Sequence, residues 1–163
     1  MADGAVHLVI LAWLGAAAFL DLRFRRLPSW WWNLVPLLGA ALWAGLRGGW
    51  AAPAAALSAV LLPRPWFLLS LPGLLWDPRP IPILAGALFR EAWERGWLGG
   101  ADACAALALL LVFPDAAMLL FLALSLAAAA LAFRWHGERR FPGLVGLLGA
   151  AAIRVGLGAL TGA

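Results

Sequence analysis

Two aspartates are the residues best suited to chemistry, because each lies where an apolar run meets a basic or glycine-rich stretch. Asp21 follows the apolar run 6–20, and Asp102 opens a run that continues to residue 113. An ionisable residue beside or within an apolar membrane segment is energetically unfavourable. It usually faces the interior of the helix bundle and serves a function there. We therefore take Asp21 and Asp102 as candidate catalytic residues.

Two carboxylates held close together cannot both ionise cheaply, so they share a proton. Such a pair suits peptide hydrolysis, since the ionised member removes a proton from water while the protonated member donates to the carbonyl oxygen. Ordinary structural roles compete with this interpretation. Asp21 could be a loop residue paired with an arginine of the segment 22–26, and Asp102 could cap the N-terminus of its helix.

Three small residues, Gly99, Gly100 and Ala101, directly precede Asp102. Small residues let a substrate or another stretch of backbone approach closely, although they also serve ordinary helix packing. We expect these three residues to form the approach to the Asp102 carboxylate.

The composition predicts a membrane protein, because 65% of the 163 residues are hydrophobic and 12% are charged. A soluble domain is about half apolar and about a quarter charged. A membrane span takes ~20 apolar residues. The runs that meet or approach this length are 6–20, 30–46, 98–113, 115–133 and 143–160.

A further candidate span, residues 53–76, is interrupted by Pro63-Arg64-Pro65. We favour a single proline-kinked span over two half-helices that enter from one side, because broken backbone at membrane depth must be shielded by protein. Residues 82–97, with alternating charges and two tryptophans, are typical of an interfacial amphipathic helix. The sequence thus predicts an all-α polytopic bundle of about six transmembrane helices, forming one domain over residues 1–163.

Arginines predict the orientation, since positive residues in short loops favour the cytoplasmic side. The loops after the expected spans 6–20 and 115–133 carry three arginines each. The loops after the spans 30–46 and 98–113 carry one and none. This alternation predicts an N-terminus outside, with Asp21 and Asp102 both at the cytoplasmic face. Trp30, Trp31 and Trp32 are expected to anchor the second span at the interface.

Other chemistry is less favoured by the sequence. The basic residues are scattered rather than gathered into one stripe, so we expect no nucleic-acid partner. Cys104 is the only cysteine and the histidines are His7 and His136, so we expect no metal ion and no other cofactor. We interpret Cys104 as core packing rather than a nucleophile. Arg154, inside the last span, is expected to find a carboxylate, backbone carbonyls or the interface.

Two sequence blocks resemble a known family. Gly99-Gly100-Ala101-Asp102 resembles the G-x-[GA]-D signature of the GxGD intramembrane aspartyl peptidases, and residues 98–107 resemble the GGADAK-type stretch of small prepilin peptidases. The run that starts at Asp21 and continues to Trp31 resembles that family's other block. Phe141-Pro142-Gly143 is similar to a Pro-Gly element late in these proteins.

The resemblance implies a six-span fold in the cytoplasmic membrane of a bacterium or archaeon. Its aspartyl dyad, Asp21 and Asp102, would cleave the leader of type IV pilin-like or archaellin-like precursors. Without the cysteine-rich insert of longer relatives, the chain would be a peptidase only.

Two alternatives stay open at the level of sequence. The family has a lysine two residues after its second aspartate, where this chain has Cys104, and this departure leaves room for a non-catalytic membrane assembly subunit of the same fold. A small transporter with Asp102 on an ion path is the other alternative. Transporters are often built from repeats with broken helices, and we find no internal repeat in the chain.

Overall fold

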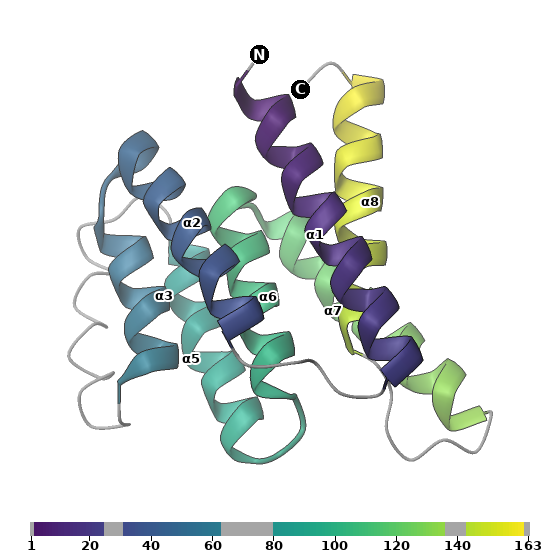
Figure 1. Cartoon of the computed structure of the whole chain (residues 1–163). Helices are drawn as coiled ribbons and strands as arrows, with labels where there is room; N and C mark the ends of the chain where they lie inside the picture. Colours follow the sequence, from purple (N-terminus) through teal and green to yellow (C-terminus); the bar gives the residue numbers. More distant parts are fainter. Residues whose placement is uncertain (1, 25–30, 63–79, 136–142, 162–163) are drawn as a thin grey trace. The chain divides into compact units, whose positions relative to one another are not determined.

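The computed structural model describes residues 2–24, 31–62, 80–135 and 143–161, and over these ranges all regular structure is helical (Figure 1). The all-α prediction is confirmed. Alanine and leucine, the strongest helix formers, dominate these segments. The helices are α1 (Ala2–Phe24), α2 (Trp31–Gly48), α3 (Ala51–Leu61), α5 (Pro80–Glu94), α6 (Gly100–Val112), α7 (Ala116–Trp135) and α8 (Gly143–Thr161).

The chain divides into two compact units, each described by itself below. The first unit joins residues 1–28 to residues 117–163 and so combines α1 with α7 and α8. The second unit, residues 29–116, contains α2, α3, α5 and α6. The expectation of one domain over residues 1–163 stays a prediction.

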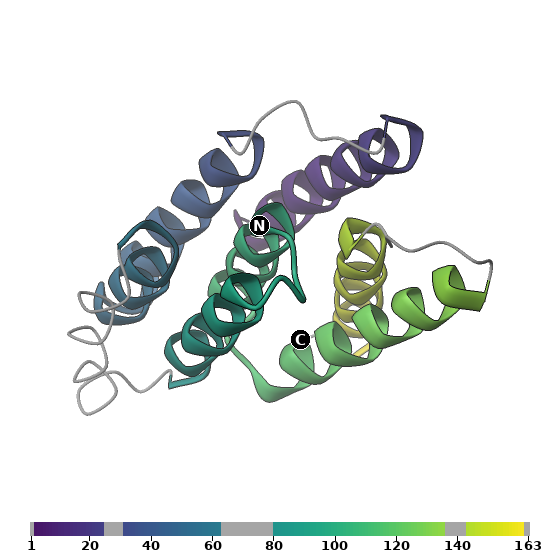
Figure 2. The same cartoon turned by 90° about the horizontal axis from the view of Figure 1, so that it is seen from below.

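In the first unit, α1 packs along α8, and the two helices lie side by side in Figure 1. Helices α7 and α8 also approach closely (Figure 2). Their contact centres on Gly146, where a Cβ would lie 2.9 Å from the carbonyl oxygen of Ser125. A small residue at this position lets the two backbones meet, as is usual for helices that pack in membranes.

In the second unit, α6 packs against α2, α5 and α3, while α3 also packs against α2 and α5. A small apolar cluster of Ala52, Ala55 and Ile83 joins α3 to α5. Every residue of α6 from Ala103 to Leu111 is buried. A helix that is apolar all round and buried along its length is the core element of its unit. Asp102 lies directly before this buried stretch.

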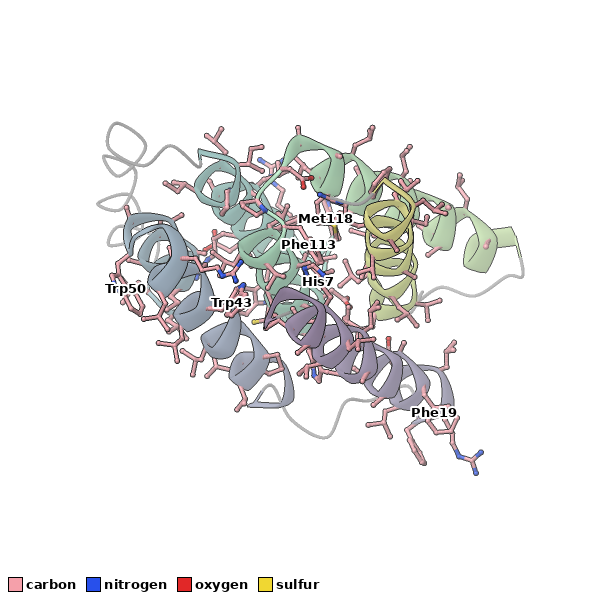
Figure 3. The ribbon with its side chains drawn as sticks, turned by 90° about the horizontal axis from the view of Figure 1, so that it is seen from above. His7, Phe19, Trp43, Trp50, Phe113 and Met118 are labelled. Atoms are coloured by element: carbon pink, nitrogen blue, oxygen red, sulfur yellow. The ribbon has the colours of Figure 1, made fainter. Side chains whose placement is uncertain are left out.

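The outward helix surfaces are also apolar. Val35, Leu38, Leu42 and Leu46 form an exposed stripe along α2, and Phe19 projects outward from α1 (Figure 3). A helix at the surface of a soluble protein has polar residues on its outer face. Apolar outer faces are those of helices that meet lipid or another protein.

Two helical segments, Gly4–Phe24 and Gly143–Leu160, are long and apolar enough to cross a membrane. Shorter apolar segments occur in α2, α6 and α7, over Leu34–Gly48, Gly100–Val112 and Ala116–Ala132. The membrane character predicted from composition is thus compatible with the helices. The count of about six spans stays a prediction.

The helix boundaries refine two expectations. Helix α3 ends at Leu61, and Leu62 is extended with φ −97° and ψ 149°, as expected for a residue that precedes proline. Helix α3 therefore ends before Pro63, and the remainder of the expected span, 63–79, lies outside the described residues. Helix α5 covers Pro80–Glu94, and its first turns are apolar all round, so its charged character is confined to its C-terminal turns.

Candidate active site

Asp102 lies in the first turn of α6, as the third residue of the helix, and its side chain is half-buried. Gly99 holds the N-cap position, and Asp102 lies three residues later, within the first turn. Its carboxylate folds back over Gly99: a Cβ at position 99 would lie 3.0 Å from Oδ2. The positive end of the helix dipole also favours an acidic residue in this turn. Gly99 and Asp102 are therefore in contact, and the role of the three small residues as an approach to the carboxylate stays a prediction.

The turn that leads into α6 has a defined geometry. Gly96 has a φ of +70°, and its N–H donates to the carbonyl of Trp93 at 2.9 Å. The N–H of Trp97 donates to the carbonyl of Ala92 at 2.8 Å. These two bonds form a Schellman motif, whose left-handed position favours glycine. Gly96 was not among the residues predicted for the site, although a glycine just beyond a helical pattern is a recognisable stop signal.

Gly100 contacts a different side chain, that of Trp93. A Cβ at position 100 would lie 3.1 Å from Cε2 of Trp93 and 3.2 Å from its Nε1, so the indole packs against the backbone of the first helical residue. Ala101, the third expected approach residue, is half-buried in the same turn. The two glycines thus make different contacts: Gly99 touches the carboxylate, and Gly100 touches the tryptophan of the preceding helix.

Arg90 links Trp93 to the end of α3. Its Nε donates to Oε1 of Glu94 at 2.6 Å, and its Nη1 donates to the carbonyl of Leu62 at 3.0 Å. The guanidinium carbon of Arg90 lies 5.3 Å from the centre of the Trp93 indole. A cation near the last carbonyls of a helix is favourable, because those carbonyls carry the negative end of the dipole. The charged residues of α5 therefore contact both α3 and the approach to α6.

Asp21 lies in the last turn of α1, which continues to Phe24, and its side chain is half-buried. It is a helical residue and not the loop residue that the sequence allowed. Arg23, in the same turn, lies over the ring of Phe24 at 5.7 Å. The C-terminal end of a helix disfavours negative charge by about 0.3–1 kcal/mol at exposed sites. The helix dipole thus does not favour an acidic residue at position 21.

Asp21 belongs to the first unit and Asp102 to the second. Because each unit is described by itself, the pairing of the two carboxylates stays a prediction. What the two sites share is a half-buried carboxylate in the terminal turn of a long apolar segment. Arg25 and Arg26, which follow Asp21 in the expected cytoplasmic loop, lie outside the described residues.

The remaining candidates have the following positions. Cys104 is 6% exposed on α6, in agreement with its interpretation as core packing. Arg154 is half-buried on α8, and His7 is half-buried on α1; His136 lies outside the described residues. In the described part of the chain, no three side chains of His, Cys, Asp and Glu come together as a metal site would require.

Compared with known proteins, the chain matches no protein-family model, no curated protein and no solved structure. The resemblance to GxGD peptidases therefore rests on the two sequence blocks around Asp21 and Asp102.

Proposed function

We propose that this protein is an intramembrane aspartic endopeptidase of the prepilin-peptidase type, with Asp21 and Asp102 as its catalytic pair. The observation that carries the proposal is the contact between Asp102 and Gly99 at the start of the buried helix α6. It gives a reason for the glycine in the G-x-[GA]-D block, because any side chain at position 99 would crowd the carboxylate.

The proposed reaction is hydrolysis of one peptide bond in a precursor. The ionised aspartate removes a proton from water as the water oxygen bonds to the carbonyl carbon, and the neutral aspartate protonates the carbonyl oxygen. The carbon–nitrogen bond then breaks: the leaving nitrogen takes a proton from the pair, and one hydroxyl of the tetrahedral intermediate returns a proton to the pair as the new carboxyl group forms. Asp21 and Asp102 exchange roles as the proton moves between them, so they are treated as one titrating unit.

A membrane location is supported by the apolar outer faces of α1 and α2 and by the two long apolar segments in α1 and α8. We propose about six transmembrane helices in a cytoplasmic membrane, with the N-terminus outside. This topology brings the C-terminal end of α1 and the N-terminal end of α6 to the cytoplasmic face, which is the condition for a dyad.

The proposed substrates are type IV pilin-like or archaellin-like precursors, which the two resembling blocks imply. A precursor held in the membrane with a short leader would present its scissile bond close to the membrane surface. Gly99, Gly100 and Ala101 are the residues through which an extended precursor would approach Asp102. No metal ion or cofactor is required by this chemistry.

The test is cleavage of a pilin-like precursor by the purified protein in liposomes. We expect a single cut at the end of the leader, identified by N-terminal sequencing of the product. A precursor whose leader is followed by a soluble domain, without the apolar helix, is the matched control and should stay intact. A wild-type protein that inserts and folds but cleaves no pilin-like or archaellin-like precursor would contradict the proposal.

A further inference from the structure

We infer that Trp93 is a positioning residue for Asp102: its indole holds the first turn of α6, and Arg90 holds the indole. This inference rests on the proposed function, since it assigns to α5 the task of fixing the depth and direction of one catalytic carboxylate. The juxtaposition that carries it is the contact of Trp93 with Gly100, one residue after the glycine that Asp102 touches.

The contact between Trp93 and Gly100 is so close that a side chain at position 100 would require the indole to shift by a few tenths of an ångström. The three atoms nearest to a Cβ there all belong to the indole, at 3.1 to 3.2 Å. Trp93 is nevertheless 38% exposed, so its ring lies at the surface of the unit rather than in its core. Because its ring is only partly buried, Trp93 adds little to the core of the unit. Its main structural effect is to fix the position of the backbone that it contacts.

Arg90 restrains the indole through contacts with three partners. Its guanidinium lies 5.3 Å from the ring centre, and it bonds both Glu94 and the carbonyl of Leu62, the residue that follows α3. The paired side chains of Arg90 and Glu94 are only 17% and 29% exposed, which strengthens their interaction relative to a fully solvated pair. A continuous series of contacts therefore runs from the end of α3, through Arg90 and Trp93, to the turn that carries Asp102.

A second arrangement of the same kind lies at the end of α5 and in the turn that follows it. Arg95 pairs with Glu91 at 2.8 Å and lies 5.0 Å from the ring centre of Trp97. This second pair is more exposed, at 55% and 37%, and Trp97 is 68% exposed. Both sets combine an i,i+4 ion pair with a cation–π contact, and the first set adds the bond from Arg90 to Leu62 and the contact of Trp93 with Gly100. Trp97 and Arg95 therefore serve as exposed controls for Trp93 and Arg90.

The consequence for catalysis follows from the sensitivity of proton transfer to position. A displacement of ~1 Å at a catalytic group can lower the rate by about 10²-fold, and such groups depend on the residues that support them. Loss of the indole would free the first turn of α6 to shift without removing any group that touches the precursor. We therefore expect kcat to fall while KM stays the same.

The first measurement compares Trp93→Leu with Trp97→Leu, and Arg90→Gln with Arg95→Gln, by the kcat and KM of precursor cleavage in liposomes. Trp93→Leu should lower kcat by about tenfold or more with KM unchanged, and Arg90→Gln should act in the same direction. Trp97→Leu and Arg95→Gln should stay within about twofold of the wild type, as exposed surface changes usually do. Equal effects in the two sets, or a change in KM alone, would overturn the positioning role.

The second measurement is a double-mutant cycle. Gly100→Ala pushes the indole aside and should lower kcat by itself. In a Trp93→Leu background the obstructing ring is gone, so adding Gly100→Ala should have no further effect; residues in contact are expected to be non-additive in this way. Independent, multiplicative losses in kcat would contradict a shared role of Trp93 and Gly100.

A third measurement separates this inference from the proposed function. In an Asp102→Cys, Cys104→Ser protein, the rate of thiol labelling at position 102 reports the exposure of that side chain without requiring catalysis. Trp93→Leu should raise this rate severalfold and Trp97→Leu should not; equal rates would overturn the inference. A wild-type protein that cleaves no precursor contradicts the proposed function, whereas the labelling comparison still decides whether Trp93 positions residue 102.

Discussion

The Asp102 carboxylate lies over Gly99, with Oδ2 3.0 Å from the position that a Cβ at residue 99 would occupy. Gly99 has φ −70° and ψ 149°, a backbone conformation that any residue can adopt. Glycine is therefore not required here by the backbone. Glycine is instead favoured by the close approach of the carboxylate, which a Cβ would displace, and this relationship can be tested separately from folding.

Gly99→Ala should impair cleavage more than it impairs stability. The new methyl group must push the carboxylate aside, and we expect kcat to fall by about tenfold or more. The free energy of unfolding should fall by about 1 kcal/mol, because alanine is a poorer N-cap than glycine. Gly39→Ala on α2 is the control, since a Cβ there meets no atom within 4 Å. Wild-type cleavage by a folded Gly99→Ala protein would show that the contact has no role in the reaction.

Gly146→Ala should destabilise the first unit. Its Cβ would lie 2.9 Å from a backbone oxygen of α7 and 3.3 Å from the Leu126 Cα, so the two helices must separate. Overpacking of this kind costs about 1–3 kcal/mol. Thermal unfolding in detergent measures the effect. Gly156→Ala is the control, because it also replaces a glycine inside α8, but a Cβ at position 156 meets nothing within 4 Å. Equal melting temperatures for the two variants would contradict the close packing of α7 on α8.

Cys104→Ser should keep most of the cleavage activity, because the thiol is buried and serves packing. Cys104→Lys introduces the residue found in the resembling family, but here it buries an ammonium group beside the apolar stretch of α6. We expect it to lower the free energy of unfolding by about 2–4 kcal/mol. Cleavage rates and melting temperatures of both variants test this account. Complete loss of cleavage in folded Cys104→Ser would indicate a catalytic thiol, and higher activity in Cys104→Lys would indicate that cysteine weakens the enzyme.

The topology makes a prediction that is independent of activity. In a Cys104→Ser background, single cysteines at positions 25 and 97 should label from the cytoplasmic side of the membrane. A cysteine at position 115, in the turn between α6 and α7, should label from the opposite side. Labelling of positions 25 and 97 from opposite sides would make an Asp21–Asp102 dyad impossible.

The sequence was sufficient to predict helices, because long runs of alanine and leucine have one dominant local solution and no strand pattern competes with it. It also identified the ends of α6 and α8 closely, since glycine-rich entries and apolar runs mark them. It did not predict that α3 would end at Leu61: a proline either kinks or ends a helix, and which one happens depends on packing around it. Here Arg90 of α5 bonds the carbonyl of Leu62, a contact between distant segments that no local pattern reveals.

The contacts around Asp102 could be anticipated only in part. The small residues before Asp102 suggested close approach, and a Cβ at position 99 would lie 3.0 Å from the carboxylate, while their role toward a substrate stays a prediction. The partner of Gly100 was not foreseen, because Trp93 was interpreted only as part of an interfacial helix. The contact depends on the Schellman turn at Gly96, which folds the end of α5 back beside the start of α6. Sequence spacing alone gives no direction for that turn.

The most direct test of the central claim is precursor cleavage by Asp21→Asn, Asp102→Asn and the double variant. An amide can neither accept the proton from water nor donate one to the carbonyl oxygen, so each single variant should lose cleavage while remaining inserted and folded. Because the two carboxylates act as a unit, the double variant should be no worse than either single one. Thermal unfolding of the purified variants controls for misfolding. Retained cleavage by a stably folded Asp21→Asn or Asp102→Asn protein would contradict the aspartyl mechanism.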